Sequence, residues 1–104
     1  MTTAAASAAA LACHVRLIRA AADLVDQAGI TGLCVWPEPG EIVIQVPEHA
    51  GDVPSRAAAV ARLAAITGAR PESDPGPGPT RGWIYARGQF AGHPVRIFTP
   101  AGEQ

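Results

Sequence analysis

The residues best suited to chemistry lie between Arg81 and Thr99, where two apolar runs alternate with basic and aromatic side chains. Successive residues of a β-strand point to opposite faces of the sheet. One face of this predicted hairpin therefore collects Trp83, Tyr85, Arg87, Arg96 and Phe98. Guanidinium groups bind carboxylates and phosphates through charge-assisted hydrogen bonds. Because the face is too aromatic for a solvated surface and too basic for a core, it predicts a contact surface.

The chemistry of this face depends on the register of the hairpin. With a two-residue turn at Ala91-Gly92, Arg87 stands opposite Arg96, and like charges in that position destabilise a sheet unless an anion offsets the repulsion. With the turn at Gly92-His93, Arg96 stands opposite Gln89 instead. We favour the second register, and both registers leave the same side chains on the same face.

Two classes of function fit the aromatic and basic face. Trp, Tyr, Phe and Arg are enriched in protein interfaces, which favours a protein-protein interaction module or accessory subunit, foremost a homodimer, with Trp36 as part of its surface. The alternative is a small nucleic-acid-binding protein. Its residues would be Arg81, Arg87 and Arg96 for phosphate and Trp83, Tyr85 and Phe98 for stacking. A third interpretation is that the Pro-rich loop or the N-terminal arm folds over the face.

The sequence predicts no catalytic residue, no metal site and no cofactor. The serines Ser7, Ser55 and Ser73 lie in a terminus, a helix start and a loop, away from any nucleophile motif. The histidines and cysteines do not follow a metal-ligand spacing. They are His14, His49, His93, Cys13 and Cys34. The two cysteines suit small buried apolar positions on a helix and a strand.

The charge balance limits the classes of partner. The net charge of -1 argues against a general nucleic-acid or membrane binder. The first 52 residues nevertheless hold two arginines against six acidic residues, and the last 52 hold six arginines against three. A local basic patch therefore remains compatible with the sequence. No run of apolar residues reaches the length of a membrane span, so we expect a soluble, cytoplasmic protein.

Two helices are predicted to carry the apolar stripes that cover the sheet. In the first, Leu11, Val15, Ile18, Ala22 and Val25 recur at helical spacing, and Gly29 is placed to end the helix. The second begins at Asp52 or Ser55 and ends at Thr67-Gly68, with Arg56 on its polar side.

A first hairpin is predicted from residues 33–36 and 41–46, joined by the turn residues Pro37 to Gly40. Pairing Trp36 with Glu41 places one apolar set on the inner face. That set is Leu33, Val35, Ile42, Ile44 and Val46, whereas Cys34, Trp36, Val43 and Gln45 point the other way.

These elements predict a single α+β domain with the order αββαββ, a two-layer sandwich of a four-stranded antiparallel sheet and two helices on one face. Its boundaries are a flexible N-terminal segment at 1–10, the domain at 11–100 with a Pro/Gly-rich loop at 70–80, and a tail at 101–104. The predicted core also contains apolar residues from the second helix and the second hairpin. They are Val60, Leu63, Ile66, Ile84, Val95 and Ile97.

Overall fold

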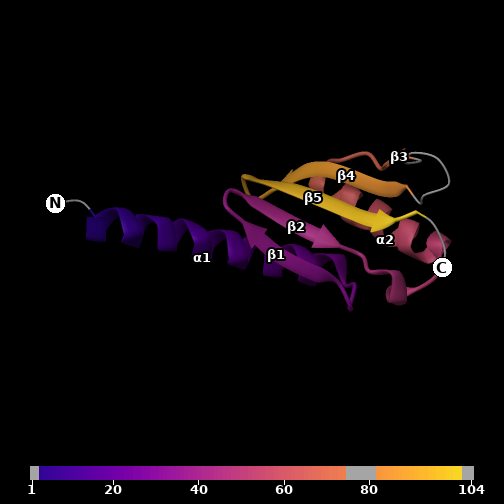
Figure 1. Cartoon of the computed structure of the whole chain (residues 1–104), viewed down its shortest axis with the longest axis horizontal. Helices are drawn as coiled ribbons and strands as arrows, with labels where there is room; N and C mark the ends of the chain where they lie inside the picture. Colours follow the sequence, from indigo (N-terminus) through magenta and orange to yellow (C-terminus); the bar gives the residue numbers. More distant parts are fainter. Residues whose placement is uncertain (1–2, 75–81, 102–104) are drawn as a thin grey trace.

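The computed structural model describes residues 3–74 and 82–101 and has an α+β fold in which two α-helices pack on a five-stranded mixed sheet (Figure 1). The helices are α1 (Thr3–Ala28) and α2 (Val53–Thr67), with a short 3-10 turn η1 (Glu48–Ala50) before α2. The strands are β1 (Cys34–Glu38), β2 (Glu41–Gln45), β3 (Glu72–Asp74), β4 (Trp83–Phe90) and β5 (His93–Pro100).

The sheet has the strand order β1-β2-β5-β4-β3, which corrects the predicted four-stranded antiparallel arrangement. The central strands β2 and β5 run parallel, and the other neighbouring pairs are antiparallel. β5 takes the central position because its inner face is the more completely buried, with Val95 and Ile97 beside Ile42 and Ile44 of β2. Because α2 carries the chain across the sheet after β2, the last strand returns in the same direction as β2.

The fifth strand, β3, lies within the segment expected to be an irregular loop. Residues 72–74 pair with β4, so the predicted loop at 70–80 is wrong for this part. The edge of β4 offers unpaired backbone groups, and three residues of extended chain are enough to bond to them. Residues 75–80 of that loop and residues 102–104 of the tail lie outside the described residues.

The first hairpin keeps its predicted faces but has a tighter turn. Glu38 pairs with Glu41 and Trp36 with Val43, two residues away from the predicted register. The turn is Pro39-Gly40, and the φ of +78° at Gly40 suits the Pro-Gly sequence of a type II turn. Because the register changes by two residues, every side chain stays on its predicted face.

Helix α1 packs through a different stripe from the one expected. Its buried residues are Leu17, Ala20, Ala21, Leu24 and Ala28. The expected stripe lies outside the core, with Leu11 63% and Ile18 44% exposed. Two apolar stripes run side by side on this helix, and periodicity alone cannot tell which of them faces the sheet. Residues 3–10 belong to the helix.

The core between the helices and the sheet otherwise contains the predicted residues. Ile42, Ile44, Val46, Val60, Leu63, Val95 and Ile97 are buried, and Leu33, Val35, Ile66 and Ile84 pack against them. Cys13 and Cys34 are exposed, which corrects the expectation that both are buried. Cys13 lies on the part of α1 that precedes the packed stripe, and Cys34 lies on the outer face of an edge strand.

The ends of α2 follow the sequence signals. Asp52 is the N-cap and accepts a hydrogen bond from the backbone N–H of Ser55 at 2.9 Å. Gly68 ends the helix in the left-handed conformation with a φ of +71°. Arg56 is buried, not on the polar side, because its guanidinium reaches carbonyl groups of neighbouring segments.

Candidate functional site

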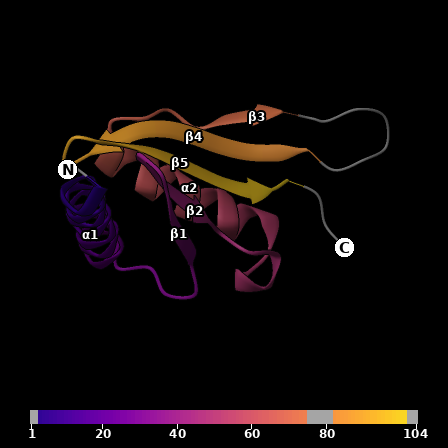
Figure 2. The same cartoon turned by 60° about the vertical axis from the view of Figure 1, so that its left-hand side comes forward.

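One face of the sheet carries no helix. Figure 2 shows α1 and α2 on the same side of the sheet, and no described element covers the opposite side. The strand alternation sends alternate side chains of each strand onto this open sheet face. From β1, β2, β4 and β5 these include Trp36, Glu41, Val43, Trp83, Tyr85, Arg87, Arg96 and Phe98.

The second hairpin places two arginines opposite each other. Its turn is Ala91-Gly92, with φ values of +53° and +82°, and Arg87 pairs with Arg96 in the ladder. The register that we favoured from the sequence, with Gly92-His93 in the turn, is therefore wrong. A two-residue turn of this kind needs positive φ at both positions, which matches the twist of the strands but is unusual for alanine. The side chains nevertheless lie on the predicted face.

Three aromatic rings form a cluster next to the arginines. Phe98 lies at the centre, with its ring centroid 5.5 Å from that of Trp83 and 6.2 Å from that of Trp36, both in edge-to-face geometry. Both tryptophans are exposed, Trp36 at 37% and Trp83 at 44%. Val43 lies between Trp36 and Arg96 in the ladder and is buried. The sheet therefore carries a small apolar layer even on its open face.

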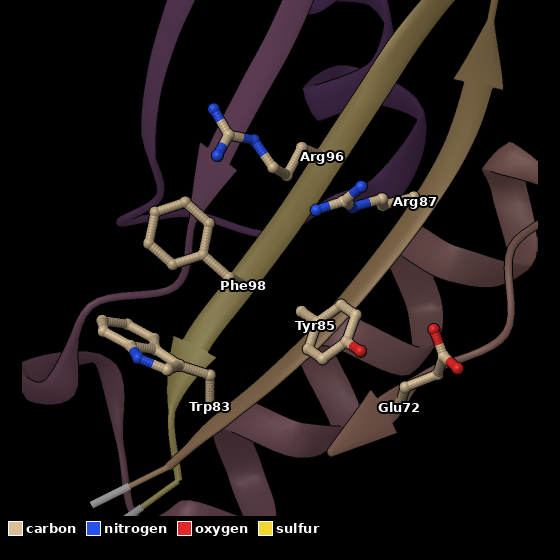
Figure 3. A pocket seen from close by; sticks show the side chains of 6 residues that line it. All are labelled: Glu72, Trp83, Tyr85, Arg87, Arg96 and Phe98. Atoms are coloured by element: carbon tan, nitrogen blue, oxygen red, sulfur yellow. The ribbon is translucent and has the colours of Figure 1, made fainter. Parts of the chain in front are cut away.

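The open sheet face is hollowed between the aromatic and basic groups. The hollow has a volume of about 610 Å³ and is lined by Glu72, Trp83, Tyr85, Arg87, Arg96 and Phe98. Figure 3 shows Trp83 and Phe98 at one end, the two arginines at the other, and Tyr85 and Glu72 on the side of β3. A ligand that fits this hollow must therefore present chemically different groups at its two ends.

The two arginines differ in their pairing. Arg96 forms an ion pair with Glu41 of β2, with 3.3 Å between its Nη2 and a carboxylate oxygen, while its buried Nε donates no hydrogen bond. Arg87 is exposed and has no ion-pair partner among the described residues. Glu41 thus pairs with Arg96, and a second carboxylate, that of Glu72, lies on the β3 side of the hollow (Figure 3). The arginine end of the hollow can therefore accept a further anion.

The structure brings together five of the six residues that the sequence assigned to a binding surface. The sixth, Trp36, lies outside the hollow and contacts Phe98 from the side of β1. Glu72 and Glu41 were missed. Glu72 belongs to the unexpected strand β3, and Glu41 reaches Arg96 only because β2 and β5 are neighbours. No local pattern in the sequence predicts the place of Glu72 in the hollow or the ion pair of Glu41 with Arg96.

No family model matches the chain, and neither a curated protein nor a solved structure matches it. Within residues 3–74 and 82–101, no helix is both long and apolar enough to cross a membrane. In the same residues, no three His, Cys, Asp or Glu side chains are grouped so that they could hold a metal ion.

Proposed function

We propose that the protein is a non-enzymatic binding module whose open sheet face binds an acidic, partly apolar segment of a partner protein. The observation that carries this proposal is the position of Arg87 directly opposite Arg96 at one end of the hollow. Opposed like charges destabilise an antiparallel pair, by about 0.2–1 kcal/mol in magnitude. A partner's carboxylate that accepts hydrogen bonds from both guanidinium groups offsets this repulsion and gains charge-assisted bonds.

The other end of the hollow supplies apolar contact. The exposed ring of Trp83 and the half-buried ring of Phe98 would cover an aliphatic or aromatic side chain of the partner. Aromatic residues and arginine are the residue types that contribute most binding energy in protein interfaces. Glu72 lies at the β3 edge and disfavours a second anion there. The preferred ligand therefore carries its acidic group and its apolar group at neighbouring positions.

The concave shape favours a partner of different shape over a second copy bound face to face. A two-fold dimer presents the same surface patch from both subunits. Two copies of a hollow of about 610 Å³ facing each other would enclose a void instead of a packed interface. A convex segment of a partner fills the hollow and leaves no void in the interface. The lining also contains no serine, cysteine or histidine that could act as a nucleophile, which supports binding over catalysis.

The nucleic-acid alternative has weaker support on this face. A surface that follows a phosphate backbone needs a positively charged groove. Glu41 and Glu72 place carboxylates on both sides of the two arginines. The remaining arginine of that alternative, Arg81, lies outside the described residues. A flanking carboxylate on each side suits a compact acidic group better than an extended phosphate chain.

Selection from a random library of linear peptides on the immobilised protein tests the proposal. We expect the enriched peptides to combine an aspartate or glutamate with a neighbouring large apolar residue. The double variant Arg87→Gln/Arg96→Gln should lose this enrichment and should weaken binding of a selected peptide at least about tenfold. Arg62→Gln/Arg70→Gln, which removes two exposed arginines from the region of α2, is the matched control and should bind normally.

Enrichment of peptides without acidic residues, or equal binding by the two double variants, would contradict the proposal. A single-stranded oligothymidylate at low salt tests the alternative. Binding of that oligonucleotide, lost in Arg87→Gln/Arg96→Gln and weakened steeply by salt, would favour a nucleic-acid-binding protein.

A further inference from the structure

The second apolar stripe of α1 is left outside the core. It consists of Leu11, Val15, Ile18, Ala22 and Val25, and we call it the α1 seam. Leu11 is 63% and Ile18 44% exposed, although both are large aliphatic residues. The residues recur at spacings of four, three, four and three, which is the heptad pattern of helices that pair along their length. The seam covers about 21 Å of the helix at 1.5 Å per residue.

The two halves of the α1 seam have different surroundings. The N-terminal half of α1 extends beyond the sheet, as Figure 1 shows, and the residues buried against the domain begin at Leu17. Leu11 and Val15 therefore stand on a projecting helix. The C-terminal half borders an apolar groove of about 500 Å³, in which Ile18 and Val25 of α1 face Val35 and Pro37 of β1. The chain thus presents a convex apolar ridge and a concave apolar groove in line on one helix.

We propose that α1 pairs with α1 of a second copy in antiparallel orientation, so that the projecting ridge of each copy occupies the groove of the other. When the two-fold axis lies between Ile18 and Ala22, Ile18 of each copy faces Ala22 of the other. Val15 then lies opposite Val25 of the second copy, and Leu11 lies beyond it at the end of that helix. Four of the five seam residues thus meet a seam residue of the second copy, Leu11 extends past Val25 to the end of that helix, and the two globular parts lie at opposite ends of the helix pair.

The charges beside the α1 seam select the antiparallel orientation. Arg19 and Asp26 occupy the same flanking position of two successive heptads, seven residues apart, and both are exposed. Antiparallel helices bring this flank against the same flank of the partner. Arg19 of one copy then faces Asp26 of the other, twice in a symmetric dimer. A parallel pair would bring His14 to Arg19 and Ala21 to Asp26, which forms no ion pair.

The occupant is a second copy because the ridge and the groove belong to one surface that is complementary to itself. The flanking charges match each other in the antiparallel pair, and the seam is continuous from the projecting part into the groove. Dimerisation through α1 leaves the open sheet face uncovered, since α1 lies on the other side of the sheet (Figure 2). This inference therefore stands independently of the function proposed for the hollow.

Sedimentation equilibrium of the full chain and two single variants tests the pairing. The wild type should sediment as a dimer at micromolar concentration. Leu11→Asp should weaken the dimer at least about tenfold. Ala10→Asp places the same charge on the same turn of α1 but off the seam, and should leave the dimer intact. Since neither residue is packed against the domain, circular dichroism and urea unfolding of the domain should show that both variants fold.

A charge reversal tests the orientation. Arg19→Asp and Asp26→Arg should each weaken the dimer, and the double variant Arg19→Asp/Asp26→Arg should restore it. A monomeric wild type at high micromolar concentration would overturn the proposal. A dimer that Leu11→Asp leaves intact and Trp83→Ala dissociates would also overturn it, because the interface would then be the open sheet face. A double reversal that fails to restore pairing would overturn the antiparallel orientation.

Discussion

Arg56 of α2 is bonded both to the turn before the helix and to the end of β5, which is distant in the sequence. It is 4% exposed, and its Nε donates a hydrogen bond to the Thr99 hydroxyl at 3.0 Å. One terminal nitrogen donates to the carbonyl oxygen of Gly51 at 2.6 Å and the other to that of Pro100 at 2.9 Å. The Thr99 hydroxyl in turn donates to the carbonyl oxygen of Val46 at 2.7 Å. This network fixes the end of β5 and the turn before α2 to the helix.

We predict that Arg56→Met lowers the free energy of unfolding by about 3 kcal/mol, because it leaves several buried carbonyl oxygens without donors. Arg56→Lys should also destabilise the protein, since an ammonium cannot reach the same set of acceptors. Urea unfolding followed by circular dichroism measures both effects. Arg62→Met, at an exposed position of α2, is the control, and equal losses for Arg56→Met and Arg62→Met would contradict the role of the network.

The sequence could not predict this burial. Helical periodicity assigns a charged residue to the outer face, and Arg56 follows Asp52 and Ser55 in a first turn that reads as polar. Two of the groups that satisfy its guanidinium, the hydroxyl oxygen of Thr99 and the carbonyl oxygen of Pro100, lie 43 and 44 positions away, at the end of β5. Only the tertiary structure brings these acceptors to the helix.

Because of the N-cap of α2, the free energy of unfolding is expected to change with pH in the acidic range. The pKa of Asp52 lies below its ordinary value because its carboxylate accepts hydrogen bonds from the hydroxyl and the backbone N–H of Ser55. A pKa lowered by folding stabilises the protein above the ordinary value of 3.8, and this contribution disappears as the pH falls through the lower folded value.

We therefore predict that the melting temperature of the wild type exceeds that of Asp52→Asn at neutral pH and that the difference shrinks as the pH falls below the ordinary aspartate range. Asn keeps a capping oxygen but cannot ionise, so the difference reports the charge alone. Thermal melts across the acidic range measure it. A difference that stays constant with pH would show that ionisation of Asp52 does not contribute.

At the scale of elements, the sequence predicted which side chains of each strand share a face of the sheet, but it did not predict which residues pair across the strands. Alternation with a period of two assigned Trp36, Trp83 and Phe98 to one face, and this assignment survived an error in the register of each hairpin. Both errors amount to a shift by two residues, which moves pairings without turning side chains over. For α1 the signal was ambiguous, because Leu17 and Ile18 belong to two adjacent stripes of similar apolar character.

The contact between α2 and β4 depends on a glycine. A Cβ added to Gly88 would lie 2.5 Å from the carbonyl oxygen of Thr67 and 2.6 Å from its hydroxyl oxygen. Because the carbonyl oxygen of Thr67 belongs to the backbone of α2, the end of α2 would have to move away from β4. Gly88→Ala should lower the free energy of unfolding by about 2 kcal/mol. Urea unfolding tests this, with Gln89→Ala at the exposed neighbouring position as the control; a neutral Gly88→Ala would mean that α2 can shift freely on the sheet.

The turn of the second hairpin contains a residue in an unfavourable conformation. Ala91 has a φ of +53°, where a side chain of this type costs about 1–2 kcal/mol relative to the right-handed region. Asparagine tolerates this region, and Asn-Gly is the preferred sequence for such turns. Ala91→Asn should therefore stabilise the protein by about 0.5–1 kcal/mol. Differential scanning calorimetry measures the effect, and a lower melting temperature for Ala91→Asn would contradict the turn at Ala91-Gly92.

At the scale of the whole molecule, the α+β class followed from the order of the elements, but the sheet topology did not. The two predicted hairpins implied a four-stranded antiparallel sheet. The choice between β4 and β5 as the neighbour of β2 is decided by burial of Val95 and Ile97 at the centre of the sheet. That choice also creates the candidate site, since it brings Glu41 to Arg96 and completes the hollow.

The two proposed surfaces lie on opposite sides of the sheet, which predicts that they act independently. The α1 seam belongs to the helical layer, and the hollow belongs to the open sheet face (Figure 2). Energetic coupling between two sites requires a structural element whose equilibrium both ligands change, and Leu11 lies on the part of α1 that precedes the residues packed against the domain.

A selected acidic peptide should therefore bind the wild type and the Leu11→Asp variant with dissociation constants that agree within about twofold. Titration calorimetry should give one peptide per chain for both proteins, because each copy keeps its own hollow in the dimer and in the monomer. Ala10→Asp serves as the control for the added charge. If Leu11→Asp abolished peptide binding while the domain remained folded, the hollow would depend on the second copy, and the two surfaces would have to belong to one interface.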